Sequence, residues 1–214
     1  MYEKNLGHSQ IIVELFGNSL IITVYIIVME TESLKIRDLT ISFWRANIYA
    51  IISVLPIFIV LYFLFSLIWE RQAISFNFPY WLFYLIGVVL HELIHGLYAL
   101  KFSKEGMKSI KFGFAWKTLT PYCHCKEPLT AGDYRIVLLS PLIILGIIPV
   151  IIGLIIGNNG VYGFGLLFIL AAGGDLIIFW KLRNENKDVL VLDSPDKCGC
   201  IVYETEEVSE NNRV

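Results

Sequence analysis

The stretch Trp81–Leu100, WLFYLIGVVLHELIHGLYAL, is mostly apolar and contains His91, Glu92 and His95. On a helix, positions i and i+4 share one face, so both imidazoles can reach one metal ion with the Glu92 carboxyl beside them. About 20 apolar residues are enough to cross the hydrocarbon core of a bilayer. Ionisable groups at that depth are costly and usually functional. The stretch therefore predicts a membrane helix that carries a metal site.

The composition of the whole chain agrees with a membrane protein. Of its 214 residues, 56% are hydrophobic and only 17% are charged, whereas about a quarter of the residues in soluble domains are charged. The apolar residues form blocks, and the mean hydropathy is +0.65. A net charge of −2 gives no reason to expect a nucleic-acid partner. We therefore expect membrane lipid as a partner.

Four stretches are long and apolar enough to be transmembrane helices, and they lie at residues 46–69, 80–101, 136–156 and 161–182. They define a membrane-embedded domain over 46–183. Between the second and third stretch, apolar and small or basic residues alternate over 110–117, which is the period of a strand. The predicted fold class is an all-α membrane protein, a bundle of about four transmembrane helices with a small cytoplasmic β-hairpin or strand insertion between helices two and three.

Lysine and arginine predict the orientation of the chain. They gather before the first span, between the second and third spans, and after the fourth, while the other two connections hold only Arg71. By the positive-inside rule, both termini and the loop next to the histidines are cytoplasmic. Residues 184–214 then form a cytoplasmic tail. We expect a multi-pass protein of the cell membrane.

The N-terminal extension, residues 1–45, allows several interpretations. No signal-peptide pattern is found there, since Glu14 and Asn18 interrupt the first apolar run. The run could be a strand pair with a turn at Gly17-Asn18, or a poor membrane segment. Residues 1–28 could also be an extension ahead of an alternative start at Met29. The extension is expected to be partly strand or disordered.

A catalytic zinc site needs three protein ligands and one open position. Counting 1.5 Å per residue from the cytoplasmic end of each span places Asp175 at a depth similar to that of His91 and His95. Asp175 is the only acidic residue in the interiors of spans three and four. His124, in the basic loop, competes with it as third ligand. Asp175 could instead be a packing residue bonded to Ser140, Tyr134 or a lysine.

The four cysteines form two Cys-x-Cys pairs, Cys123/Cys125 and Cys198/Cys200. All four are predicted to be cytoplasmic, where reduced thiols are usual. A second zinc site is an open alternative, although structural zinc sites favour Cys-x₂-Cys.

The sequence also resembles known proteins. The histidine motif in a membrane helix, a basic loop and a later aspartate resemble the site-2 protease class of intramembrane metalloproteases. Residues from about Leu34 to Glu204 look more like a small bacterial family of zincin membrane peptidases with unknown substrates. The matching stretches are Leu90–Gly96, Phe112–Phe114, Pro121–Cys125, Ser140–Ile143 and Gly174-Asp175. This chain has Gly-Gly-Asp-Leu where the site-2 class usually has Asn-Pro-Asp-Gly around the distal aspartate.

The resemblance implies a zinc-dependent membrane endopeptidase that cleaves a membrane-associated protein or peptide substrate near the cytoplasmic side. One Zn²⁺ would be held by His91, His95 and Asp175, and Glu92 would act as general base and acid. The alternative is a catalytically silent membrane scaffold or binding protein that keeps the zincin fold. The predicted strand suggests a substrate site at Phe112, Gly113 and Phe114, where an extended peptide could pair with the strand edge.

Overall fold

The computed structural model describes residues 34–69, 78–116, 120–194 and 197–205. The predictions for residues 1–33 and for the end of the tail beyond 205 lie outside these residues. The chain divides into two compact units. Residues 36–203 form one unit, which contains every described helix, and the other comprises 1–35 and 204–214.

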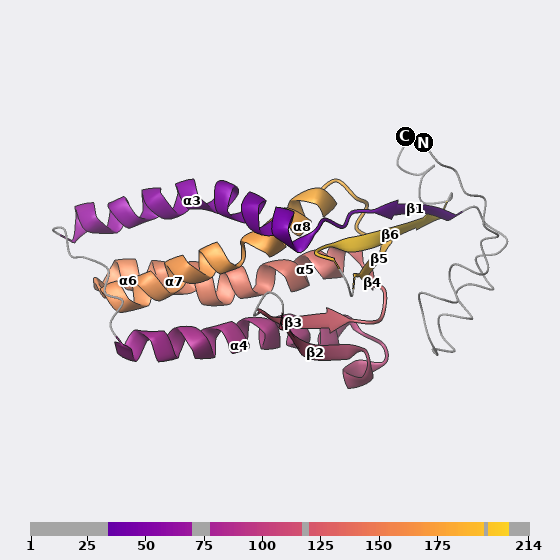
Figure 1. Ribbon diagram of the computed structural model, residues 1–214, viewed down its shortest axis with the longest axis horizontal. Helices are drawn as coiled ribbons and strands as arrows, with labels where there is room; N and C mark the ends of the chain where they lie inside the picture. Colours follow the sequence, from indigo (N-terminus) through magenta and orange to yellow (C-terminus); the bar gives the residue numbers. More distant parts are fainter. Residues whose placement is uncertain (1–33, 70–77, 117–119, 195–196, 206–214) are drawn as a thin grey trace. The chain divides into compact units, whose positions relative to one another are not determined.

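The four stretches predicted to be helical are helical (Figure 1). The first two are single helices, α3 (Phe43–Ile68) and α4 (Phe78–Phe102). The third is a continuous helical segment of α5 (Ala131–Pro141), η2 (Leu142–Ile147) and α6 (Ile148–Ile156). The fourth comprises α7 (Asn159–Ala171) and α8 (Gly173–Leu182). In Figure 1 these four segments lie side by side.

The third and fourth segments are irregular. η2 follows Pro141 and is a π-helix, a form that often occurs at functional sites. The axes of α7 and α8 differ by 47° at the break next to Ala172. Gly173 lies at this break, and a side chain there would meet Ala50 of α3, since an added Cβ would be 2.8 Å from the Ala50 Cβ. The glycine therefore lets α3 approach α8 closely.

The helices pack through small residues and stacked rings. The rings of Phe65 and Tyr162 are stacked with centroids 4.5 Å apart, and the Tyr162 hydroxyl donates a hydrogen bond of 2.6 Å to the Leu61 carbonyl. Gly153 of α6 lies against the backbone of Tyr162 in α7, where an added Cβ would be only 2.5 Å from the Tyr162 nitrogen. These contacts fix α3, α6 and α7 against one another.

Two small sheets accompany the helices. β2 (Ile110–Ala115) and β3 (Thr120–Cys125) form an antiparallel hairpin, in which Phe112 lies opposite Cys123. This confirms the strand predicted between the second and third helical stretches. The second sheet has the order β1-β6-β5-β4, with β1 (Leu34–Asp38), β4 (Leu129–Thr130), β5 (Leu190–Asp193) and β6 (Cys200–Thr205). Its β5 and β6 come from the tail, for which no strands were predicted.

Among the described residues, three helical segments are long and apolar enough to cross a membrane, and α7 with α8 makes a fourth if the bent pair is one span. The apolar side chains on these helices remain largely exposed within the chain. Examples that are more than half exposed are Ile52, Val60, Phe63, Leu67, Leu82, Leu85, Val89, Leu97, Ile155 and Ile156. The bundle therefore carries an extensive apolar outer surface, which is compatible with a membrane protein.

Candidate metal centre

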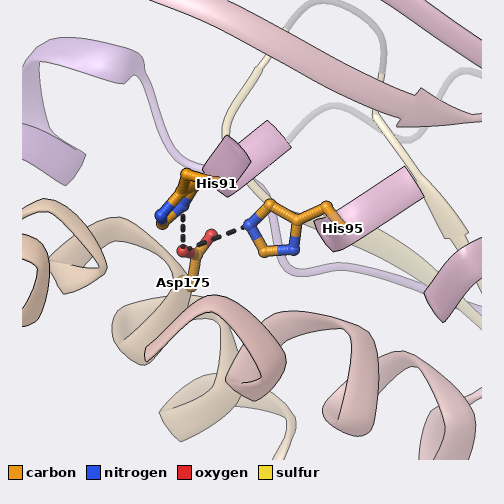
Figure 2. Close-up of side chains that lie close together, drawn as sticks. All are labelled: His91, His95 and Asp175. Carbon is orange, nitrogen blue, oxygen red and sulfur yellow. Dashed lines mark hydrogen bonds and ion pairs between the residues drawn. The ribbon is translucent and has the colours of Figure 1, made fainter. Parts of the chain in front are cut away.

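His91, His95 and Asp175 converge on one point, although Asp175 is 84 positions from His91 (Figure 2). The histidines lie one turn apart on α4, so their rings point to the same side of the helix. Asp175 lies in the first turn of α8. The Asp175 Oδ2 atom is 3.2 Å from Nε2 of His91 and 3.4 Å from Nε2 of His95. The three side chains are 10%, 12% and 19% exposed, so the cluster is largely shielded from solvent.

These distances fit a metal. In a tetrahedral zinc site with bonds of about 2.0–2.1 Å, neighbouring ligand atoms are about 3.3–3.4 Å apart. Two imidazole nitrogens and a carboxylate oxygen are also a donor set that zinc accepts in catalytic sites. Among the described residues, these three form the one group of histidine, cysteine and acidic side chains whose ligand atoms converge closely enough to share an ion.

The surroundings orient His95 more firmly than His91. Nδ1 of His95 lies 2.9 Å from the carbonyl oxygen of Val137 in α5, so that nitrogen donates a hydrogen bond and Nε2 is left for the metal. Nδ1 of His91 is buried and has no hydrogen-bond partner among the described residues. The His91 ring packs beside Phe168, with centroids 6.4 Å apart. Packing, rather than a second hydrogen bond, holds that ring.

The Asp175 carboxylate does not make the packing contacts that were considered as an alternative. The Ser140 hydroxyl donates to the Val137 carbonyl, and the Tyr134 hydroxyl donates to Asp193. Asp175 instead contacts the two histidines of α4. The break before α8 brings its first turn towards α4 and so supplies the third converging atom.

Glu92 lies beside the centre in a cavity of about 430 Å³. His95 and Asp175 line the same cavity. The backbone N–H of Cys123, in β3, donates a hydrogen bond to the Glu92 carboxylate. The hairpin is held against this part of α4 by Gly96, where an added Cβ would be 2.3 Å from Phe112 Cζ and 3.3 Å from Cys123 Sγ. A glycine directly after His95 thus lets β3 approach the motif.

The cavity runs along the free edge of β3. All five residues from Pro121 to Cys125 line it, and consecutive side chains of a strand point to opposite faces. Because side chains from both faces of β3 line the cavity, the cavity lies at the edge of this strand. The Lys126 N–H donates a hydrogen bond to the carbonyl of Ser109, which lies opposite it in the hairpin. In an antiparallel pair of strands, hydrogen-bonded and non-hydrogen-bonded residue pairs alternate, so every second residue of β3 is hydrogen-bonded to β2. The backbone of Pro121, Cys123 and Cys125 therefore faces away from β2, towards the cavity.

Comparison with known proteins supports this reading of the centre. Residues 84–190, half of the chain, match the family described as "putative zincin peptidase". The chain belongs to this family. No curated protein and no solved structure matches the chain. Membership confirms the predicted zincin peptidase family and suggests a zinc peptidase, whereas the resemblance to the site-2 protease class stays a prediction. The matched range includes both histidines, Glu92 and Asp175.

The structure places His124, the competing candidate for the third ligand, outside the converging group. Its Nδ1 lies 2.9 Å from Asp193 Oδ2, and the Tyr134 hydroxyl donates a 2.9 Å hydrogen bond to Asp193 Oδ1. All three residues line the cavity. Asp193 was missed by the sequence analysis because it lies in the tail, 69 positions from His124, and only the pairing of β5 brings it here.

The cysteines are free and, among the described residues, do not form a second group that could hold a metal. Burial raises the pKa of Cys123 and Cys200 to about 12, and that of Cys125 and Cys198 to about 11. Burial is the largest cause, and nearby carboxylates, Asp193 in each case, contribute part of each rise. The thiols therefore stay protonated at neutral pH.

The residues predicted to bind substrate lie in β2. Of the described residues that line the cavity, the contribution of the hairpin comes from β3. Phe112 packs on α4 at Gly96, and Gly113 lies beneath the Tyr122 ring. A role for Phe112, Gly113 and Phe114 in substrate binding stays a prediction, while the strand that adjoins the cavity is β3.

Proposed function

We propose that this member of the zincin peptidase family is a membrane-embedded, zinc-dependent endopeptidase that cleaves a peptide bond near the cytoplasmic side of the membrane. The observation that carries the proposal is the convergence of His91, His95 and Asp175 beside a cavity that also contains Glu92. A scaffold that had lost activity would have no use for a carboxylate at that position. Glu92 therefore favours the enzyme over the silent scaffold.

His91, His95 and Asp175 would hold the ion, each through one atom of the converging set. When bound there, zinc supplies a Lewis acid that makes water more acidic and polarises a peptide carbonyl. The hydrogen bond between His95 and Val137 keeps one imidazole in the orientation and tautomer that binding requires. The carboxylate of Asp175 adds a negative charge that favours a dication at this depth.

Glu92 would act as the general base and then as the general acid. It lines the cavity, so it can accept a proton from the attacking water and pass it to the nitrogen of the leaving amine. The backbone N–H of Cys123 holds the carboxylate in place. This N–H belongs to the edge of β3 that faces the cavity. The same strand edge therefore positions the general base and borders the proposed substrate groove.

The substrate would bind as an extended segment along the free edge of β3. That edge offers the carbonyls of Pro121, Cys123 and Cys125 and the N–H of Cys125 to a paired strand, while the Cys123 N–H is bonded to Glu92. A helical membrane segment keeps its carbonyls in intrahelical hydrogen bonds, so it has to unwind before attack. Pairing with β3 would compensate for the hydrogen bonds that the substrate loses.

The membrane assignment rests on the apolar outer surface of the helices, which would face lipid. The basic loops predict that the end with the hairpin is cytoplasmic. The experiment that tests the proposed function is reconstitution of zinc-loaded protein into liposomes with a library of fluorogenic peptides. Cleavage by the wild type and its loss in Glu92→Gln with zinc retained would support the peptidase. Equal cleavage by both proteins would refute it.

A further inference from the structure

The cavity holds a second, polar cluster next to the metal centre, made of His124, Asp193 and Tyr134. Its three members come from β3, β5 and α5. The Tyr134 residue is 5% exposed, and the side chains of His124 and Asp193 are 13% and 19% exposed. A cluster of this kind has to be hydrogen-bonded internally or used for binding.

The bonds within the cluster fix the orientation of the His124 ring. A carboxylate only accepts hydrogen bonds, and both oxygens of Asp193 are engaged, one by the Tyr134 hydroxyl and one by His124 Nδ1. The proton of that bond therefore sits on Nδ1. The other ring nitrogen, Nε2, has no hydrogen-bond partner among the described residues, and the imidazole lines the cavity. Nε2 is thus free to bind a ligand.

His124 is also placed close to the reacting groups. It directly follows Cys123, whose N–H bonds to the Glu92 carboxylate. A peptide lying along the β3 edge would pass both residues. When both ring nitrogens carry a proton, Nδ1 keeps its hydrogen bond to Asp193 and Nε2 presents an N–H to the cavity.

We propose that His124 contacts the substrate and donates a hydrogen bond from Nε2 to the carbonyl oxygen as negative charge develops on it, with Asp193 and Tyr134 as positioning residues. The inference rests on the proposed function, because this charge appears only when a peptide carbonyl is attacked. The alternative is purely structural, with His124 and Asp193 joining the hairpin to β5. The two roles predict different results for a His124 variant. A donor to the oxygen affects only ligands that mimic the charged state, whereas a structural link affects all ligands alike.

Two probes separate these readings without any cleavage. The first is a phosphinic Leu–Leu pseudodipeptide, whose tetrahedral anionic phosphorus resembles the attacked carbonyl. The second is leucine hydroxamate, which binds a zinc ion and lacks that centre. Leucine suits the apolar part of the cavity, which is lined by Ala99, Leu129, Val137, Leu138 and Ile178. Dissociation constants are measured by calorimetry on full-length, zinc-loaded protein in detergent.

For His124→Ala we expect about 100-fold weaker binding of the phosphinic probe, the size expected when one donor to an oxyanion is removed. Binding of the hydroxamate should change by less than about 3-fold, because its metal contacts persist. His124→Gln retains an N–H donor and should recover part of the loss. Asp193→Asn and Tyr134→Phe should give smaller losses, again confined to the phosphinic probe.

Equal weakening of both probes in His124→Ala, or no weakening of either, would overturn the proposal. If His124→Ala melts early or loses zinc, the comparison is made with His124→Gln, for which an affinity identical to that of the wild type would count against the role. A wild type that cleaves no peptide refutes the proposed function alone, since neither probe is turned over. A wild type that fails to bind the phosphinic probe overturns the role of His124.

Discussion

Nε2 of His91 lies 3.2 Å from Oδ2 of Asp175, across 84 positions of sequence. Without this contact the His91 ring would make no hydrogen bond to a described residue, because its Nδ1 has no partner. The contact exists because α8 begins at a break, and because Gly173 lets α3 approach at that point. The break before α8 and the small side chain of Gly173 thus allow Asp175 to reach the two histidines of α4.

The first prediction concerns Glu92. Glu92→Gln keeps the size of the side chain and removes its basicity, so peptide cleavage should fall by about 10²–10⁴-fold, the usual contribution of a general base. Zinc content should stay at the wild-type value, since Glu92 is not one of the converging ligands. Cleavage rate and zinc content are measured on the same preparation. Loss of the metal in Glu92→Gln would instead make this carboxylate a ligand.

The second prediction compares two glycines. An alanine Cβ at Gly153 would lie 2.5 Å from the backbone nitrogen of Tyr162, whereas at Gly174 no atom lies within 4 Å. Gly153→Ala should therefore lower the free energy of unfolding by about 1–3 kcal/mol through overpacking. Gly174→Ala should leave it unchanged or raise it slightly, because alanine favours the helix. Thermal melting in detergent measures both, and equal melting temperatures would contradict the packing of α6 on α7.

The four thiols give a prediction about pH. With pKa values raised to about 11 or 12, the thiolate fraction at pH 8 is about 10⁻³–10⁻⁴, against about a quarter for an unperturbed cysteine. Alkylation by N-ethylmaleimide at pH 8 should therefore be on the order of 100–1000-fold slower in the folded protein than in the unfolded one. Fast alkylation of the folded protein, followed by mass spectrometry, would show that the thiols are not held in this environment.

The same shifts affect stability. Because each folded-state pKa is raised, the thiols contribute stability that is present below the unfolded pKa of about 8.5 and is lost as the pH rises to 11 or 12. The melting temperature should therefore fall across that range. Replacing Cys200, the most buried of the four, by alanine should reduce the fall. A fall of the same size in that variant would assign the pH dependence to other groups.

The helices and the histidine motif could be predicted because their signals are local. Long apolar runs and the spacing of His91 and His95 need no knowledge of the rest of the chain, and Asp175 followed from comparing depths along two spans. The start of α5 was placed five residues late, at 136. The missed signal was Thr130, whose hydroxyl accepts from the Asp133 N–H as an N-cap.

The remainder could not be read from local pattern because it depends on pairing between distant segments. β5 and β6 are short strands in a polar tail, and their pairing is what brings Asp193 to His124. The choice of β3 over β2 as the strand beside the cavity depends on which edge of the hairpin faces α4. An alternating pattern identifies a strand but not the neighbour of each edge.

The most direct test of the central claim is the zinc content of purified wild type, His91→Ala, Asp175→Ala and His124→Ala. The account predicts about one zinc per chain in the wild type, as three ligands and an open position require. The ion should be lost in the first two variants and retained in the third, which lies outside the converging group. A well-folded wild type without zinc after exposure to the metal, or an Asp175→Ala variant that binds it as tightly, would contradict the account.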